Sequence, residues 1–331
     1  MVLSATRAVC HDRHALSGEV EFIALMRSLA THPGARGLQD DAAVLDVGKA
    51  QIVLTHDMLI EGVHFLSDDP AETVAWKLVA VNMSDLAAKG ATPLGILLGF
   101  SLTGNSGWDR SFTVGFDAAL KHFGVPLLGG DTVALPDGTP RALGLTAIGN
   151  APTCGAPSRS SAKAGDVLYV SGTIGDAGAG LALLRTGQAK PAPLIEAYSR
   201  PMPSLALGQA LAPLVSAMAD VSDGLLIDAS RIAQASGCGL EIDLGAVPLS
   251  SAFILARGDS CESRLFAATC GDDYRLIFSI DPAHIDALPE LGIPLTCIGT
   301  CTDATGLSLT YQGENIPLPD CLGYEHGASI T

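Results

Sequence analysis

Basic residues are scarce in this chain. Its 331 residues include 19 lysines and arginines against 35 aspartates and glutamates, which gives a formal net charge of −16. Because nucleic acids and anionic membranes are bound by neutralising their phosphates with lysine and arginine, we expect neither as a partner. A polyphosphate ligand stays open, since divalent cations can lie between acidic side chains and phosphate oxygens.

The chain also lacks the signals of membrane insertion, secretion and structural metals. No apolar stretch approaches the roughly 18 uninterrupted residues of a membrane helix. Residues 1–21 carry scattered charges instead of the apolar centre of a secretory signal. The eight cysteines contain no C-x-x-C pair, which disfavours zinc fingers and disulfide scaffolds. We therefore expect a cytoplasmic protein with reduced, mostly buried cysteines.

Glycine-rich phosphate loops are missing as well. The sequence has no G-x-x-x-x-G-K-[ST], and no G-x-G-x-x-G follows a predicted strand. The glycine-rich run at residues 172–178 has the wrong spacing, and a plain strand-to-helix turn explains it equally well. Without the lysine of such a loop, the charge of a bound phosphate must be met by metal ions.

What the chain does contain is aspartate beside short apolar runs, in six places: Asp41, Asp57, Asp85, Asp131, the pair Asp220 and Asp223, and Asp272. Aspartate is rarely buried unless it is paired, hydrogen-bonded or bound to metal. A helix cap or an Asx-turn explains any single case. Six cases without basic partners indicate hard divalent cations with oxygen ligands, Mg²⁺ above all. Magnesium in turn suggests phosphate.

Alternating helical and strand patterns predict two α/β units, in an α/β or α+β arrangement. The first unit, residues 19–152, has predicted helices at 19–30, 70–90 and 112–123 and strands at 42–45, 51–55, 94–102 and 143–149. Residues 153–164 are rich in proline, serine and glycine and begin the second unit, residues 153–326. Its predicted strands are 167–171, 275–280 and 295–299, and its helices begin at 175, 204 and 225.

Two local patterns have both a functional and a structural explanation. His64 lies seven residues beyond Asp57 in an apolar turn, where a lone histidine is usually structural. Asp220 and Asp223 bracket Ser222 just before a predicted helix, whose N-terminal dipole and free N–H groups attract phosphate. Helix capping remains the alternative for Ser222 and Asp223.

Eight motifs in this order resemble thiamine-monophosphate kinases, a family of the aminoimidazole-ribonucleotide synthetase-like ATP-using superfamily: QDDAAVL, THDMLIEGVHF, VNMSDLAAKGATP, GGDT, SRSSAKAGD, SGTIGDAGAGL, DVSDGL and GDDYRLIF. The resemblance implies the two-domain fold of that superfamily, with N-terminal sheets pairing into a barrel-like core of a homodimer. It also implies phosphorylation of thiamine monophosphate to thiamine diphosphate, with ATP as co-substrate and several Mg²⁺ ions. Another synthetase or kinase of the superfamily, or a catalytically inactive nucleotide-binding homologue, remains the alternative.

The resemblance further implies three sets of site residues. The magnesium ligands are Asp41, Thr55, His56, Asp57, Asp85, Asp131, Asp220 and Asp223. The ATP-binding residues are Gly130, Asp131, Arg159 and Ser222, and the substrate-binding residues are His64, Asp272 and Tyr324. No separate catalytic residue is implied, because the acceptor is already a phosphate anion.

Four positions depart from the family pattern. His56 replaces a threonine or small residue, and Arg275 replaces an acidic residue. Gly327 stands where an aromatic residue is usual. Lys89 replaces an apolar residue at a predicted helix end, where we expect its charge to favour the helix dipole.

Overall fold

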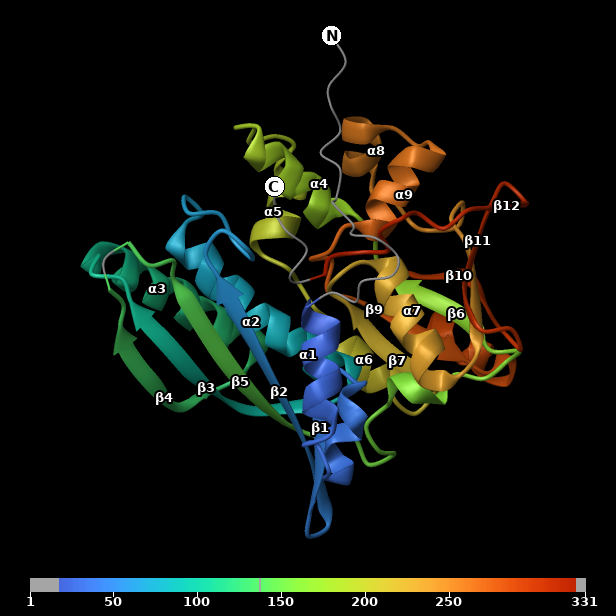
Figure 1. Ribbon diagram of the computed structural model, residues 1–331, viewed down its shortest axis with the longest axis horizontal. Helices are drawn as coiled ribbons and strands as arrows, with labels where there is room; N and C mark the ends of the chain where they lie inside the picture. Colours follow the sequence, from blue (N-terminus) through green and yellow to red (C-terminus); the bar gives the residue numbers. More distant parts are fainter. Residues whose placement is uncertain (1–17, 137, 326–331) are drawn as a thin grey trace.

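The computed structural model describes residues 18–136 and 138–325, which form two lobes (Figure 1). The first lobe is built on a five-stranded sheet with the order β1-β2-β5-β3-β4. Its strands are β1 (Ala43–Val47), β2 (Ala50–Ile60), β3 (Thr92–Leu102), β4 (Leu127–Ala134) and β5 (Ala142–Asn150). Its helices are α1 (Gly18–Arg27), the 3₁₀ helix η1 (Pro33–Leu38), α2 (Ala71–Ala88) and α3 (Ser106–Phe123).

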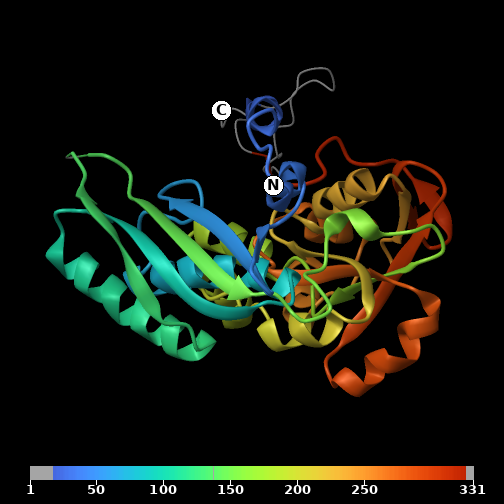
Figure 2. The ribbon, with the colours of Figure 1, turned by 90° about the horizontal axis from the view of Figure 1, so that it is seen from below.

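Within the described residues, helices cover one face of this sheet. Alternate residues of β5, such as Leu143, Leu145 and Ala147, are fully buried in a core shared with α2 and α3. Figure 2 shows these helices along one side of the sheet. The other side exposes large apolar residues, including Met58 and Leu97, and every residue of the edge strand β4 is exposed.

The second lobe is built on a seven-stranded sheet with the order β12-β11-β8-β10-β6-β9-β7, antiparallel except between β8 and β11. The strands are β6 (Val167–Ser171), β7 (Val215–Val221), β8 (Gly239–Asp243), β9 (Arg275–Ile280), β10 (Leu295–Thr302), β11 (Gly306–Tyr311) and β12 (Glu314–Ile316). The helices are η2 (Arg159–Ser161), α4 (Asp176–Arg185), α5 (Ala192–Ser199), α6 (Leu205–Leu211), α7 (Leu225–Ser236), α8 (Ser251–Arg257), α9 (Cys261–Thr269) and η3 (Pro282–Leu291).

Helix α2 belongs to both lobes. It is apolar nearly all round, which is typical of a helix buried on every side. Its middle packs into the core of the first sheet, while Ala87 and Ala88 pack with Leu211 of α6 and Phe278 of β9. The C-terminal half of α2 therefore lies where the two lobes meet.

The main predicted helices and strands are confirmed, with some corrections. Helices α5, α8 and α9 and strands β4, β7, β8, β11 and β12 were not predicted. The two sheets lie on either side of the boundary expected at residue 152.

Two further sequence expectations concern membranes and cysteines. Among the described residues, no helix is both long enough and apolar enough to cross a membrane. Cys321 is disulfide-bonded, so the expectation of reduced cysteines is wrong there, although six other described cysteines are free. Two of those six, Cys154 and Cys297, are exposed.

Candidate active site

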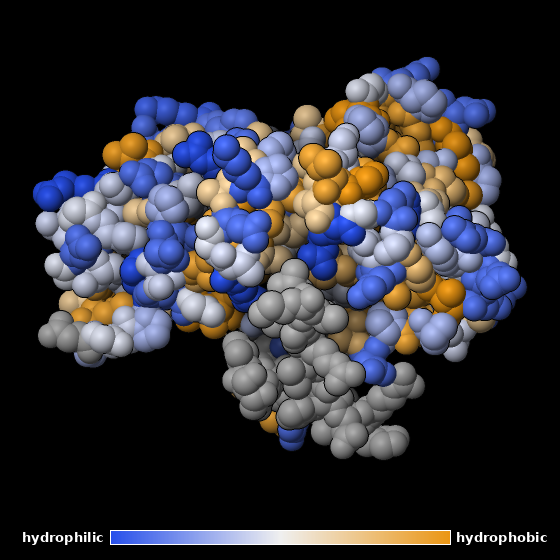
Figure 3. Space-filling view, turned by 90° about the horizontal axis from the view of Figure 1, so that it is seen from above, coloured by the Kyte–Doolittle hydropathy of each residue, from blue (hydrophilic) through white to orange (hydrophobic). Residues whose placement is uncertain are grey.

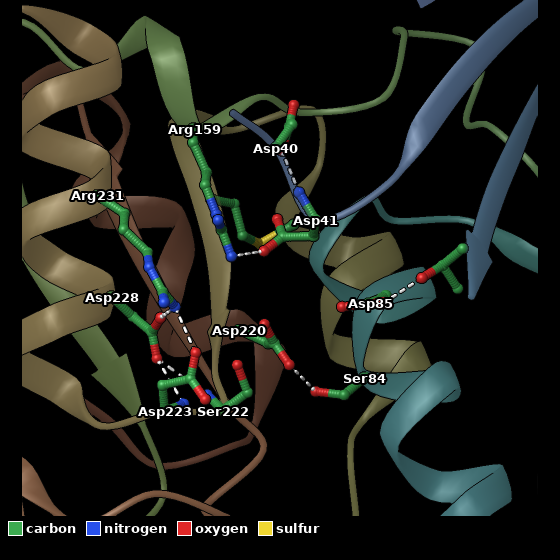
Figure 4. A network of polar contacts seen from close by, with 12 residues as sticks. Asp40, Asp41, Ser84, Asp85, Arg159, Asp220, Ser222, Asp223, Asp228 and Arg231 are labelled. Atoms are coloured by element: carbon green, nitrogen blue, oxygen red, sulfur yellow. Dashed lines mark hydrogen bonds and ion pairs between the residues drawn. The ribbon is translucent and has the colours of Figure 1, made fainter. Parts of the chain in front are cut away.

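Three carboxylates from distant parts of the chain converge between the lobes. Oxygens of Asp41, Asp85 and Asp220 all lie within 4.8 Å of one another. Asp41 precedes β1, Asp85 is on α2 and Asp220 is in β7, so the three side chains approach from different elements (Figure 4). The structure thus brings together three of the eight predicted magnesium ligands as one acidic cluster.

Hydroxyl groups beside the acidic cluster hold two of its carboxylates. Ser84 Oγ donates to Asp220 Oδ2 over 2.7 Å, and Thr55 Oγ1 donates to Asp85 Oδ2. Both bonds join segments that are far apart in sequence, so the cluster depends on the packing of α2 between β2 and β7. The bonds also fix which carboxylate oxygens are left to face the centre.

Strand alternation separates three consecutive predicted ligands. Thr55 faces α2, and the backbone N–H of Asp57 donates to Asn82 Oδ1 on the same helix at 3.3 Å. His56 lies on the open face of the sheet, where its Nδ1 is 2.9 Å from Thr146 Oγ1. The His56 imidazole is therefore directed away from the acidic cluster, contrary to its inclusion among the magnesium ligands.

Burial and mutual repulsion raise the pKa values of the clustered aspartates. Burial is the main cause that raises the pKa of Asp85 and of Asp220 well above the usual range, and neighbouring aspartates add to it. Burial, with repulsion from Asp223 and Asp41, raises the pKa of Asp57 to about 6. In addition, Asp41 Oδ2 is buried and lies 2.5 Å from Lys89 Nζ. This all-oxygen donor set fits Mg²⁺.

Lysine and arginine do accompany these aspartates, which corrects the expectation from sequence. Lys89 is fully buried and forms ion pairs with Asp40 and Asp41, with Nζ 2.5 Å from Asp41 Oδ2. It is therefore more than an exposed cation at a helix end. Burial alone would raise the pKa of Asp40, but Lys89 and Arg36 hold it below the usual range.

Arg159 adds a second cation on the other side of Asp41. Its guanidinium pairs with Asp41, while its Nε is buried and has no hydrogen-bond partner. Ser236 Oγ donates to the Arg159 carbonyl over 2.8 Å, which ties η2 to α7. An arginine held in this way, with an unused donor, suits a phosphate oxygen.

The loop between β7 and α7 is organised by two residues that were not predicted, Asp228 and Arg231. Asp228 Oδ2 accepts hydrogen bonds from the N–H groups of Ser222 and Asp223, at 3.0 and 3.1 Å. Arg231 Nη1 lies 2.6 Å from Asp223 and 2.7 Å from Asp228. Because α7 is capped at Gly224 without a side-chain bond, the capping explanation of Ser222 and Asp223 is wrong. In the sequence, an acid and a base three residues apart on the predicted helix could have indicated this pair.

A buried lysine links two of the predicted substrate residues. Lys77 Nζ donates to the His64 carbonyl at 3.0 Å and to Asp272 Oδ2 at 2.8 Å. Tyr274 Oη donates to Asp272 Oδ1 at 2.9 Å. A pocket of about 310 Å³ adjoins this group, with Trp76, Asp272 and Arg275 in its wall. Lys77 was not predicted, although a lysine inside an apolar helix was a visible sign.

The remaining predicted residues lie elsewhere. The Tyr324 N–H donates to the Asp223 carbonyl at 2.9 Å, which places it beside the β7–α7 loop, and Gly327 lies outside the described residues. Gly130 and Asp131 are on the edge strand β4, where the register runs from Asp131 through Gly99 and Gly144 to Met58. At about 4.8 Å per strand, Asp131 is roughly 14 Å from the β2 ligands. A single chain does not bring it to the acidic cluster.

Comparisons with known proteins identify the family. Models of AIR synthase related proteins match residues 39–151 (N-terminal domain) and 163–312 (C-terminal domain). The thiamine-monophosphate kinase of Escherichia coli (strain K12) is 40% identical over 307 residues, covering 88% of this chain and 92% of that protein. A thiamine-monophosphate kinase structure from Stenotrophomonas maltophilia K279a is 36% identical, with a TM-score of 0.74 over 90% of this chain and 96% of that one.

A third similar protein, AaThiL complexed with AMPPCP and TMP, has a TM-score of 0.81 at 26% identity. That match covers 96% of this chain and 100% of the other. Family models, sequence relatives and structures agree over both lobes. The chain therefore belongs to the thiamine-monophosphate kinase family of AIR synthase related proteins.

Proposed function

We propose that this chain transfers the γ-phosphoryl group of ATP to thiamine monophosphate, giving thiamine diphosphate and ADP. The observation that carries the proposal is the convergence of Asp41, Asp85 and Asp220 beside Arg159, in a chain without a P-loop lysine. The complex of AaThiL with AMPPCP, an ATP analogue, and TMP supports it.

The metal side of the site is formed by carboxylates. Asp41, Asp57, Asp85 and Asp220 would hold Mg²⁺, with Thr55 and Ser84 orienting two of them. When bound, the ions neutralise the charge on donor and acceptor phosphates during in-line transfer. The protein's own part is to hold these oxygens in place and to offer Arg159 to the nucleotide phosphates. Ser222, in the loop fixed by Asp228, provides a further polar contact.

The acceptor side lies toward Asp272. The pocket there has an aromatic wall at Trp76 and carboxylates at Asp272 and Asp273, which suit the cationic thiazolium ring of thiamine. His64 belongs to the loop that Lys77 joins to Asp272, so it is placed to meet the substrate phosphate. Tyr324 lies beside the β7–α7 loop, where its N–H donates to the Asp223 carbonyl. Because the acceptor is an ionised phosphate, no general base is required.

The direct test is an assay of purified protein with ATP, Mg²⁺ and thiamine monophosphate. We expect thiamine diphosphate and ADP in equal amounts, and no appreciable product from unphosphorylated thiamine. Turnover of a different acceptor instead would favour another enzyme of the superfamily. The absence of ADP formation with every acceptor tested would favour an inactive nucleotide-binding homologue.

We further propose that the chain forms a homodimer through the open face and edge of the first sheet. The exposed face carries Met58 and Leu97, and the exposed strand β4 carries Leu128 and Val133. An exposed apolar edge strand is prone to pairing, and a second copy covers it symmetrically. Pairing of two such sheets gives the barrel-like core expected from sequence.

The dimer also gives a reason for the position of Asp131. It lies on the exposed edge strand, so a second copy is able to bring it to a site that its own chain does not reach. The mass in solution should be twice the 33.8 kDa of the chain. A monomer at micromolar concentration would contradict this proposal. The cytoplasmic location remains a prediction from sequence.

A further inference from the structure

Lys89 carries a positive charge into the centre of the acidic site. It is the C-cap residue of α2 and is completely buried. Its ammonium group contacts Asp40, lies 2.5 Å from Asp41 Oδ2 and donates to the Met218 carbonyl of β7 at 3.3 Å. Among described residues, Asp41 is the point where Lys89, Arg159 and the acidic cluster meet.

We propose that Lys89 is a built-in cation of the metal site, which positions Asp40 and Asp41 and takes over part of the positive charge otherwise supplied by Mg²⁺. The inference rests on the proposed magnesium site. It assigns a positioning role to Lys89, which departs from the family pattern. Lys89 is neither among the predicted magnesium ligands nor among the predicted substrate-binding residues.

The geometry favours this role over a purely structural ion pair. The one ammonium group is shared by two neighbouring carboxylates, and one of them belongs to the three-carboxylate cluster. Asp40 has a second cation in Arg36, which also donates to the carbonyls of Ala156 and Pro157 at 2.9 Å. Without Lys89, Asp40 would stay paired with Arg36 and Asp41 with Arg159, but Asp41 Oδ2 would lose its contact with the ammonium group.

Removing the charge of Lys89 should increase the affinity of the site for Mg²⁺. A buried carboxylate that loses its counterion is strongly destabilising. A ligand that binds only the folded state restores stability by an amount that grows with the logarithm of its concentration divided by its Kd. The two effects make the free chain less stable and its response to Mg²⁺ larger.

The experiment measures Mg²⁺ binding without nucleotide, by calorimetry and by melting temperature across a Mg²⁺ titration. Lys89→Met keeps the length of the side chain and removes its charge. We expect a lower melting temperature without Mg²⁺, a Kd for Mg²⁺ about tenfold lower than in the wild type, and a gap in melting temperature that closes as Mg²⁺ saturates. Lys89→Arg should restore behaviour close to the wild type.

Lys77→Met is the matched control, because Lys77 is also a buried lysine of α2 but pairs with Asp272. It should lower stability without tightening Mg²⁺ binding. An unchanged or weaker affinity in Lys89→Met, or the same tightening in Lys77→Met, would overturn the inference.

If Lys89→Met does not fold, Asp40→Asn tests the same idea in the opposite direction. Removing one of the two acids that share Lys89 makes the site less negative, so Mg²⁺ should bind more weakly than in the wild type. Unchanged or tighter binding in Asp40→Asn would overturn the inference. A wild-type chain that binds no Mg²⁺, alone or with AMPPCP, would instead refute the magnesium site itself.

Discussion

At the scale of single residues, the direction of each side chain decides its role. Thr55 and Asp57 face α2, while His56 between them faces the open side of the sheet. The alternation follows from strand geometry and was available from sequence once the strand was known. The basic partners of the acidic residues could not be predicted from sequence, because they are far away along the chain. Lys89 is 49 residues from Asp40, and Arg159 is 118 residues from Asp41.

Replacing His64 by alanine should weaken binding of the acceptor selectively. The His64 ring accepts a hydrogen bond from the Ile60 N–H at Nδ1 over 2.9 Å, which fixes the orientation of the ring within its turn. Loss of one charged hydrogen bond, about 1.4 kcal/mol, should raise the KM for thiamine monophosphate about tenfold and change the KM for ATP little. Steady-state kinetics with each substrate varied separately measures both.

His284→Ala is a suitable control for this variant, because His284 is exposed on η3 in the second lobe, where its Nδ1 lies 3.3 Å from the Leu214 carbonyl oxygen. It should leave both KM values unchanged. A defect confined to ATP in His64→Ala would mean that His64 belongs to the nucleotide side of the site.

The response of the protein to Mg²⁺ should depend on pH through Asp57. Its pKa is raised from 3.8 to about 6 by burial and then by Asp223 and Asp41, so folding favours the protonated form. This contribution is complete below pH 4 and is lost as the pH rises through 6. Metal ligands must be deprotonated, so Mg²⁺ should raise the melting temperature more at pH 7.5 than at pH 5.5.

Asp57→Asn removes one titrating group and should reduce this pH dependence, while Asp85 and Asp220, whose pKa values are also raised, retain part of it. A wild-type Mg²⁺ response that is the same at both pH values would contradict the assignment of Asp57 as a buried acid in the site. Melting curves with and without Mg²⁺ in matched buffers suffice for the comparison.

At the scale of elements, long patterns were predictable and short ones were not. Proline and glycine at its ends predicted α2, and continuous apolar runs predicted β3 and β5. Short elements such as α8 and β12 contain too few residues for a period to show. The start of α7 at Leu225 was predicted correctly, but capping by Ser222 or Asp223 was not confirmed, because Asp228 supplies the hydrogen bonds of this loop.

The two aspartates near the start of α7 should therefore differ in effect. Asp228 is fully buried, and its removal leaves two backbone N–H groups without their acceptor and Arg231 with Asp223 as its remaining partner. Asp228→Ala should destabilise the protein by about 2–4 kcal/mol. Asp223 is partly exposed, so Asp223→Ala should cost less than about 1 kcal/mol but weaken use of ATP.

Chemical denaturation and the KM for ATP, measured on both variants, separate these effects. Greater destabilisation by Asp223→Ala than by Asp228→Ala would refute the division of roles. So would an unchanged KM for ATP in Asp223→Ala at a stability equal to that of the wild type.

At the scale of the whole molecule, the site exists only because the two lobes share α2. The acidic cluster takes Asp41 from the first lobe, Asp85 from α2 and Asp220 from the second lobe. In the space-filling view, hydrophobic side chains appear in patches on both lobes among hydrophilic ones (Figure 3). The open face of the first sheet exposes apolar side chains in the lone chain, and at the level of sequence the family resemblance alone implied a second copy as its partner.

Charge placed on that open face should separate the proposed dimer. Leu97 is 40% exposed in the single chain and would be covered in the dimer. Leu97→Asp should give a monomer in light scattering, because two buried like charges repel across the symmetric interface. Asp117→Asn, at an exposed position of α3, should remain dimeric. A dimeric Leu97→Asp protein would move the interface elsewhere.

The central claim is that the acidic cluster holds the Mg²⁺ through which ATP phosphorylates thiamine monophosphate. The most direct measurement is the rate of thiamine diphosphate formation across a Mg²⁺ titration, in the wild type and in Asp85→Asn. Loss of this charge should reduce turnover by about 10² or more, while the fold, checked by circular dichroism, is retained. Wild-type rates and an unchanged Mg²⁺ dependence in folded Asp85→Asn would contradict the account.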